Sequence, residues 1–207
     1  MLGKTHAAVG AAAALYVVYP DTIEGVVFTA AAGIAGGLLC DIDSPKTAIH
    51  QKAILLLTGV IAVIAIAFLN GKTAGDIAQA GAWLISESAD PRAFYGAILL
   101  LLCIVAAFTK HRTFSHSIVF ALSVWFLMSR AFEPAAVPLT AGVVSHIVLD
   151  LLNEHGIQLF WPFSSKLRFK LCSSKGAVNS FLFYLGIGAS FLLAAESLGV
   201  FTRAQLF

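Results

Sequence analysis

The sequence predicts an all-α fold, a polytopic transmembrane helix bundle of about six to seven spans. Of its 207 residues, 59% are hydrophobic and only 12% are charged, about half the charged fraction of a soluble domain. The mean hydropathy is +0.89, and apolar runs of roughly 20 residues, the length that crosses a bilayer, recur along the chain. We therefore expect a single integral-membrane domain over residues 1–207.

Three apolar runs begin the predicted bundle. Residues 6–19 form a short run, and because no clear cleavage site follows it, we expect a first helix rather than a cleaved signal peptide. A tight turn at Tyr19-Pro20-Asp21 leads to residues 22–40, whose GIAGGLL stretch has the glycines that let membrane helices approach closely. Residues 52–69 form the third run.

Four further runs follow an acidic loop at residues 70–92. Each is mostly apolar and close to the length that a span requires. A basic loop at residues 153–176 precedes the last run. The four runs are residues 93–109, 116–132, 135–152 and 177–200.

Lysine and arginine are distributed unequally between the two ends of these predicted helices. Lys72, Arg92, Arg130 and Arg203 fall on one side of the alternating topology, and the other nine of the 13 fall on the opposite side. Basic residues are retained on the cytoplasmic side. We therefore expect a multi-pass protein of the cell inner (plasma) membrane, with a cytoplasmic N-terminus and an external C-terminus.

Histidine and aspartate residues gather at the predicted cytoplasmic ends of the helices. Ionisable side chains in or near a span are costly, so they mark functional sites more often there than in a soluble core. They come from four stretches: the start of the first run, GLLCDIDSP, HRTFSHS and SHIVLDLLNEHG. The candidate metal ligands are His6, Asp41, Asp43, His111, His116, His146 and Asp150.

Two of these stretches hold paired ligands at informative spacings. His146 and Asp150 are four residues apart, so they share one helical face and can bind one ion or support each other. Asp41 and Asp43 are two apart, and the following Pro45 predicts a turn or extended piece in which both carboxylates point the same way.

The HRTFSHS motif predicts a junction between a loop and a helix. His111 and His116 are five residues apart, too far for one helical face, and we expect Ser115 or Thr113 to cap the next span. Arg112 is a candidate for binding a substrate phosphate through its planar guanidinium group, or for anchoring the topology.

Imidazole and carboxylate ligands together suit zinc, manganese or iron, whereas calcium favours oxygen ligands alone. We expect one or two divalent ions, zinc before manganese or iron, and two neighbouring ions are a common arrangement for phosphoester hydrolysis. Plainer explanations exist for the parts, such as a solvated turn at the acidic pair or a structural hydrogen bond within a helix. Seven candidate ligands on one face of the membrane favour a metal site over these separate explanations. Catalytic roles are expected for Asp41, Asp43, Asp150 and Arg112.

The segment FWPFSSKLRFK, residues 160–170, interleaves aromatic residues with Lys166, Arg168 and Lys170. This composition is typical of an interfacial segment attracted to anionic lipid headgroups, and it would also guide an anionic substrate. We expect membrane lipids and a lipid or phosphoester substrate as partners, and no nucleic acid. His50 and His155 are expected to be solvated loop residues.

At these motifs the sequence resembles the YdjM-like family of predicted membrane-bound, metal-dependent hydrolases, some of whose members are under LexA control. The resemblance rests on THAAVG, GLLCDIDSP, HRTFSHS and HIVLDLLNEHGIQLFWPF, which occur in the order of the family and run from residue 5 to residue 163. It implies a metal-dependent hydrolase in a bacterial inner membrane or an archaeal membrane, with the seven candidate ligands at the matching positions. Asn153 and Gly156 also fall on the pattern of the family, whereas His50 and His155 do not.

The leading hypothesis is a hydrolase of phosphoester bonds in a lipid or lipid-linked substrate. A water molecule with a lowered pKa would attack phosphorus, and one Asp would accept its proton. Arg112, with Lys166 and Arg168 further out, would hold the anionic group. The alternatives are a metal-ion or proton transporter and a non-catalytic membrane protein that binds metal. The absence of HExxH and GxSxG motifs disfavours a zinc protease and a serine hydrolase.

Overall fold

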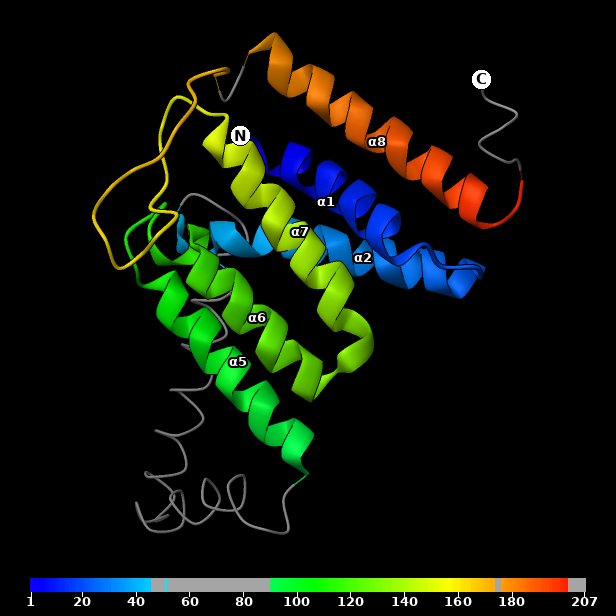
Figure 1. Cartoon of the computed structure of the whole chain (residues 1–207), viewed down its shortest axis with the longest axis horizontal. Coiled ribbons are helices and arrows are strands. Elements are labelled where there is room, and N and C mark those ends of the chain that lie inside the picture. Colours follow the sequence, from blue (N-terminus) through cyan, green and yellow to red (C-terminus); the bar gives the residue numbers. More distant parts are fainter. Residues whose placement is uncertain (46–50, 52–89, 174–175, 201–207) are drawn as a thin grey trace.

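The computed structural model describes residues 1–45, 51, 90–173 and 176–200, and within these ranges the protein is helical (Figure 1). This confirms the predicted all-α class. The predicted span at residues 52–69, most of the acidic loop and His50 lie outside the described residues. The helices are α1 (Gly3–Val18), α2 (Ile23–Leu39), α5 (Pro91–Ala107), α6 (Ile118–Ala131), α7 (Glu133–Leu151) and α8 (Ala177–Ser197), with short 3₁₀ helices η1 (Cys40–Asp43) and η2 (Phe114–His116).

Three helices in the described ranges are long and apolar enough to cross a membrane: Ile23–Asp43, which joins α2 and η1, together with α7 and α8. Helices α5 and α6 are apolar but shorter, with 17 and 14 residues. Within the described ranges, full-length spans are therefore fewer than the predicted runs that fall there. One physical reason is that Ser117 caps α6 later than the sequence suggested, so the helix begins at Ile118.

Glycines let α1, α2 and α7 pack with their backbones in close contact. A side-chain carbon at Gly36 of α2 would collide with the carbonyl of Leu139 in α7, and one at Gly37 would collide with the carbonyl of His6 in α1. This is the close approach expected of small residues in membrane helices. It brings the start of α1 beside the end of α2 and the last turns of α7.

A hydrophobic core between η1, α5, α6 and α7 holds the two short helices in place. Ile42 of η1 and Phe114 of η2 are buried in it, together with Phe120 and Val124 of α6. The polar residues beside Ile42 and Phe114 are therefore held toward the opposite side, where the end of α7 lies.

The chain after α7 folds back over the end of that helix as a loop between α7 and α8 (Figure 1). Two isolated bridges, Asn153 with Cys172 and Ile157 with Leu167, connect its two arms. Helix α8 then packs against α1. The side-chain amide of Asn179 in α8 accepts hydrogen bonds from the Leu2 backbone N–H, at 3.2 Å, and from the Thr5 hydroxyl, at 3.1 Å.

Candidate metal centre

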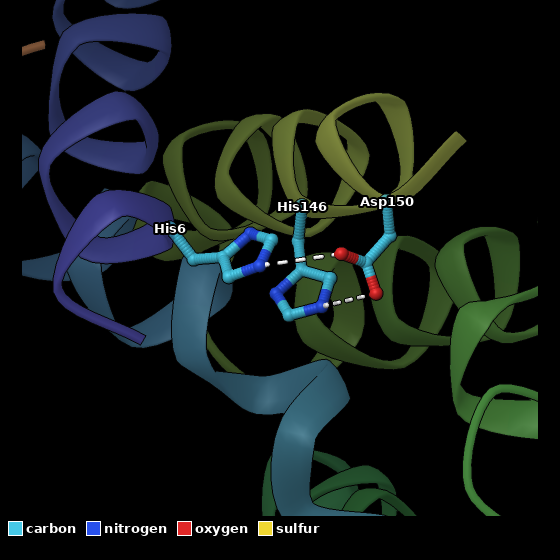
Figure 2. A group of neighbouring side chains, drawn as sticks. All are labelled: His6, His146 and Asp150. Atoms are coloured by element: carbon cyan, nitrogen blue, oxygen red, sulfur yellow. Dashed lines mark ion pairs between the residues drawn. The ribbon is translucent and has the colours of Figure 1, made fainter. Parts of the chain in front are cut away.

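All seven predicted ligands come together at one end of the bundle, and we refer to them as the His/Asp cluster. Helix α1 supplies His6 near its start, η1 supplies two aspartates, the η2 region two histidines, and α7 His146 and Asp150 near its end. Figure 2 shows His6 pointing from α1 toward the last turns of α7. The predicted convergence of remote stretches is therefore present in the structure.

The first group in the cluster consists of His6, His146 and Asp150, all buried. The Nε2 atom of His6 lies 3.5 Å from Oδ1 of Asp150, and Nε2 of His146 lies 4.0 Å from Oδ2 of the same carboxylate (Figure 2). The two imidazole rings stack with their centroids 3.6 Å apart. One ligand atom from each residue lies within 4.8 Å of the others, so this group could hold a metal ion.

The second group consists of Asp41, His111 and His116 and adjoins the first. Nε2 of His116 is 3.2 Å from Nε2 of His146 and 3.5 Å from Oδ2 of Asp150. Oδ1 of Asp41 is 3.8 Å from Nε2 of His146. The ligand atoms of both groups therefore form one continuous polar volume. Its six candidate ligands are enough to bind one or two ions.

Hydrogen bonds to the Nδ1 atoms orient three of the four histidines. His146 donates from Nδ1–H to the carbonyl of Gly37 at 2.7 Å, and His111 donates from Nδ1–H to Oδ1 of Asp43 at 2.6 Å. The Nδ1–H of His116 donates to the Ser115 hydroxyl at 2.8 Å. In each ring Nε2 is left as the ligand atom, which is how a neutral histidine binds a metal.

Asp43 supports the cluster from outside the two groups. Its Oδ1 accepts from His111, and its Oδ2 accepts from the Arg112 backbone N–H at 3.0 Å and the Ser115 hydroxyl at 2.5 Å. The predicted turn is a 3₁₀ helix over Cys40–Asp43. Both carboxylates face the histidines of the η2 region, since Asp41 groups with His111 and His116 and Asp43 accepts from His111.

Arg112 links the cluster to the surface. Its Nη2 lies 3.3 Å from Oδ2 of Asp150, and its Nη1 donates to the carbonyl of His155 at 2.8 Å. Its Nε is buried and has no hydrogen-bond partner among the described residues. Its backbone has a φ of 66°, a left-handed conformation that is unusual for arginine and is often found at functional sites.

His116 has a perturbed pKa for reasons that the geometry explains. Burial lowers the pKa of this imidazole, but its contacts with the Asp150 and Asp43 carboxylates outweigh burial and raise the pKa to about 9. His116 lies in η2, before the start of α6. The two carboxylates thus favour the protonated form of this ring, which a metal ion would have to displace.

A cavity of about 960 Å³ opens beside the cluster, and we call it the basic cavity. His111 belongs to both, and Arg112, which contacts Asp150 of the cluster, lines the cavity as well. The arms of the loop after α7 supply the rest of its charged lining, Glu154, Lys166, Arg168 and Lys170. The sequence singled out the three cations of this loop but did not predict that they share a cavity with His111.

Two contributions were missed at the sequence level. Ser115 was expected as a helix cap, but Ser117 caps α6 through its bond to the Phe120 N–H, while Ser115 joins Asp43 to His116. Gly37 was expected only to permit close packing, yet its carbonyl sets the tautomer of His146. The position of Ser115 between two candidate histidine ligands could have indicated its role. Nothing in the sequence indicates that the backbone carbonyl of Gly37 accepts from His146. His155 lies outside both ligand groups and its side chain is 67% exposed, as expected.

A family model described as the YdjM inner membrane protein matches residues 1–206. The chain is also similar to a curated protein of Bacillus subtilis (strain 168) described as uncharacterized protein YvsG, with 30% identity over 86 residues. That match covers 41% of this chain and 54% of YvsG, so the chain spans about half the length of this relative. No solved structure matches the chain.

Proposed function

The chain belongs to the YdjM inner membrane protein family, and from this premise we propose that it is a membrane-embedded, metal-dependent hydrolase. Its substrate is a phosphoester bond in a lipid or lipid-linked compound. The His/Asp cluster lies on the cytoplasmic face of the inner membrane, with the N-terminus in the cytoplasm and the C-terminus outside. The basic residues that favour this orientation include Lys166, Arg168 and Lys170, close to the cluster.

One observation carries the proposal: four imidazoles and two carboxylates direct ligand atoms into one continuous, largely buried volume. Both ring nitrogens of His6 are buried without a hydrogen-bond partner in the part of the chain that the structure describes. Two Nε2 atoms, from His116 and His146, lie 3.2 Å apart. Buried polar groups left unpaired are costly, and a cation among them would satisfy these nitrogens and balance the carboxylates.

The donor set fits one or two divalent ions. His6, His146 and Asp150 would hold one, and Asp41, His111 and His116 the other. Mixed nitrogen and oxygen ligands favour zinc, with manganese or iron as alternatives. A divalent ion there would supply a Lewis acid that lowers the pKa of water and stabilises charge on a phosphoryl oxygen.

The protein side chains would orient the substrate and accept the proton. Asp41 is suited to accept it, because its side chain is 14% exposed whereas that of Asp150 is 2% exposed and contacts both Arg112 and the amino group of Met1. Arg112 lies between the cluster and the basic cavity, where a guanidinium group favours phosphate.

The arrangement favours a surface enzyme over an ion pathway. A pathway needs ionisable groups at successive depths of the membrane. In the described ranges, every buried histidine and carboxylate belongs to the His/Asp cluster at one end of the bundle: His6, Asp43, His116, His146 and Asp150.

The test is metal analysis of the purified protein in detergent, followed by a screen with phosphomonoester and phosphodiester substrates. We expect bound zinc and metal-dependent hydrolysis, both lost in His146→Ala and Asp150→Asn. Asp21→Asn, an exposed carboxylate in the turn between α1 and α2, serves as the matched control and should retain both. Wild-type protein without metal, or activity that survives the two cluster substitutions, would refute the proposal.

A further inference from the structure

The basic cavity has more positive than negative lining charge. Arg112, Lys166, Arg168 and Lys170 are cations, and Glu154 is the carboxylate that faces them. Lys166, Arg168 and Lys170 form no ion pair with any carboxylate among the described residues, since Glu154 pairs only with His155, at 3.9 Å. These charges therefore remain available to an anionic ligand.

The loop arm at residues 166–171 alternates charged and apolar residues, and its charged residues line the cavity. The backbone N–H groups of Leu167, Phe169 and Leu171 donate to carbonyls of Ile157, Leu151 and Leu152 at 2.8–2.9 Å. The positive φ of 52° at Lys170 turns the backbone there. Lys166, Arg168 and Lys170 line the cavity, whereas Leu167, Phe169 and Leu171 do not belong to its lining. One side of this arm is therefore cationic.

The other side of the same arm is apolar and exposed. Leu167, Phe169 and Leu171 are 41%, 66% and 69% exposed, and Phe163 nearby is 71% exposed. Exposed aromatic and aliphatic side chains beside cations are suited to the boundary between lipid tails and headgroups. A ligand that contacts both sides must be amphiphilic, with phosphate groups and a hydrocarbon chain.

The charge of the cavity distinguishes among such ligands. A phosphodiester headgroup carries a single negative charge and a phosphomonoester about two. Lys166, Arg168 and Lys170 form no ion pair among the described residues, and Arg112 beside them also contacts Asp150. This charge matches a ligand with two phosphates better than a phosphodiester or a phosphomonoester. His111 and Arg112 line the cavity and also belong to or contact the cluster, so one phosphate at these residues would leave room for another beside the lysines.

We propose that the basic cavity is a second phosphate subsite, and that the ligand is a lipid-linked diphosphate. Lys166, Arg168 and Lys170 bind the phosphate that does not react, while Phe169 and Leu171 contact the hydrocarbon chain. The identification of this ligand as the substrate rests on the proposed hydrolase function. The binding of a diphosphate does not, so the two can fail separately.

The first test measures binding without metal. Chelator-treated protein in a non-ionic detergent is titrated with inorganic pyrophosphate and with inorganic phosphate by calorimetry. We expect pyrophosphate to bind about tenfold or more tightly, because it engages more cations. Lys166→Gln with Lys170→Gln should weaken pyrophosphate about tenfold, whereas Lys4→Gln with Arg130→Gln, an equal loss of charge outside the cavity, should not.

Three outcomes would overturn the subsite. They are equal affinity for phosphate and pyrophosphate, equal weakening by the two double variants, and no pyrophosphate binding by well-folded wild-type protein. Size-exclusion profiles identify any variant that does not fold, and Glu154→Gln then provides a second readout, since removal of the carboxylate should strengthen pyrophosphate binding. Pyrophosphate binding that persists in His146→Ala, which lacks the metal site, would support the subsite even if no hydrolysis is found.

The second test separates a lipid-linked from a soluble diphosphate. Farnesyl diphosphate should bind more tightly than pyrophosphate, and Phe169→Ser with Leu171→Ser should weaken farnesyl diphosphate alone. Equal affinities for the two probes, or no effect of these substitutions on farnesyl diphosphate, would refute the lipid-linked ligand.

Discussion

Asp43 determines the geometry of the His/Asp cluster without joining either group of ligands. It is 2% exposed, and its two oxygens accept from the His111 ring, the Ser115 hydroxyl and the backbone N–H of Arg112. Carboxylates that hold metal-binding histidines in this way raise the basicity of the ring and hold its orientation. Asp43 is thus placed to position ligands of the candidate metal centre.

We predict that Asp43→Asn weakens metal binding about 10- to 100-fold. An amide cannot accept from every donor that surrounds the carboxylate, so His111 and Ser115 lose their orientation. Competition with a chromophoric chelator measures the affinity, with Asp21→Asn as the control. Unchanged affinity would mean that Asp43 does not position the ligands.

The raised pKa of His116 predicts that metal affinity depends on pH. Only the neutral imidazole binds a metal, and the pKa of about 9 means that a proton must leave first. Affinity should therefore rise about tenfold per pH unit as the pH increases from about 7 toward 9, and then level off. Chelator competition across this range measures the slope, and His116→Gln should remove it. A flat profile for the wild type would exclude His116 as a ligand.

At the level of elements, the close packing of α1, α2 and α7 holds the ligands of remote segments within reach of one another. The glycines at this contact have no space for a side chain, because the facing atoms are backbone carbonyls. Gly37 has a second role, since its carbonyl accepts from His146. Packing and ligand orientation are therefore coupled through α2.

We predict that Gly36→Ala destabilises the protein by about 1–3 kcal/mol, the cost of overpacking a tight contact. The new methyl group would collide with the carbonyl of Leu139, and α7 would have to shift. Thermal unfolding in detergent measures the loss, and metal affinity should fall in parallel. Gly188→Ala in α8, where nothing lies within 4 Å, is the matched control and should be neutral or slightly stabilising. Similar melting of the two variants would contradict this account.

At the scale of the whole molecule, the cluster and the basic cavity lie at one end of the bundle, and the turn between α1 and α2 lies at the other. The start of α1 carries His6, and its end at Val18 leads into that turn. Exposed apolar side chains on α8, such as Phe181, Tyr184 and Phe191, are consistent with a surrounding bilayer. The polar end is then the end that meets water and lipid headgroups.

Cysteine accessibility tests the orientation of this end. In a variant without the three native cysteines, Lys166→Cys should react with a membrane-impermeant reagent only after the cells are opened, and Asp21→Cys should react in intact cells. The reverse pattern would place the cluster outside the membrane and contradict the cytoplasmic site.

The sequence by itself determined the all-α membrane class, most helix positions and the identity of the cluster residues. Apolar runs and the scarcity of charged residues can be read directly from the sequence, and they predict membrane helices. Because an ionisable residue is costly in or near a span, its presence there indicates a functional site. The i to i+4 spacing of His146 and Asp150 was enough to predict a shared face, and the structure confirms it.

Only the tertiary structure decided which partners the other polar residues of the site contact. The different contacts of Asp41 and Asp43, the cap at Ser117, the tautomer of His146 and the cavity lined by Lys166 depend on contacts between distant segments. Such choices follow from packing among helices, which the order of residues along one segment does not specify.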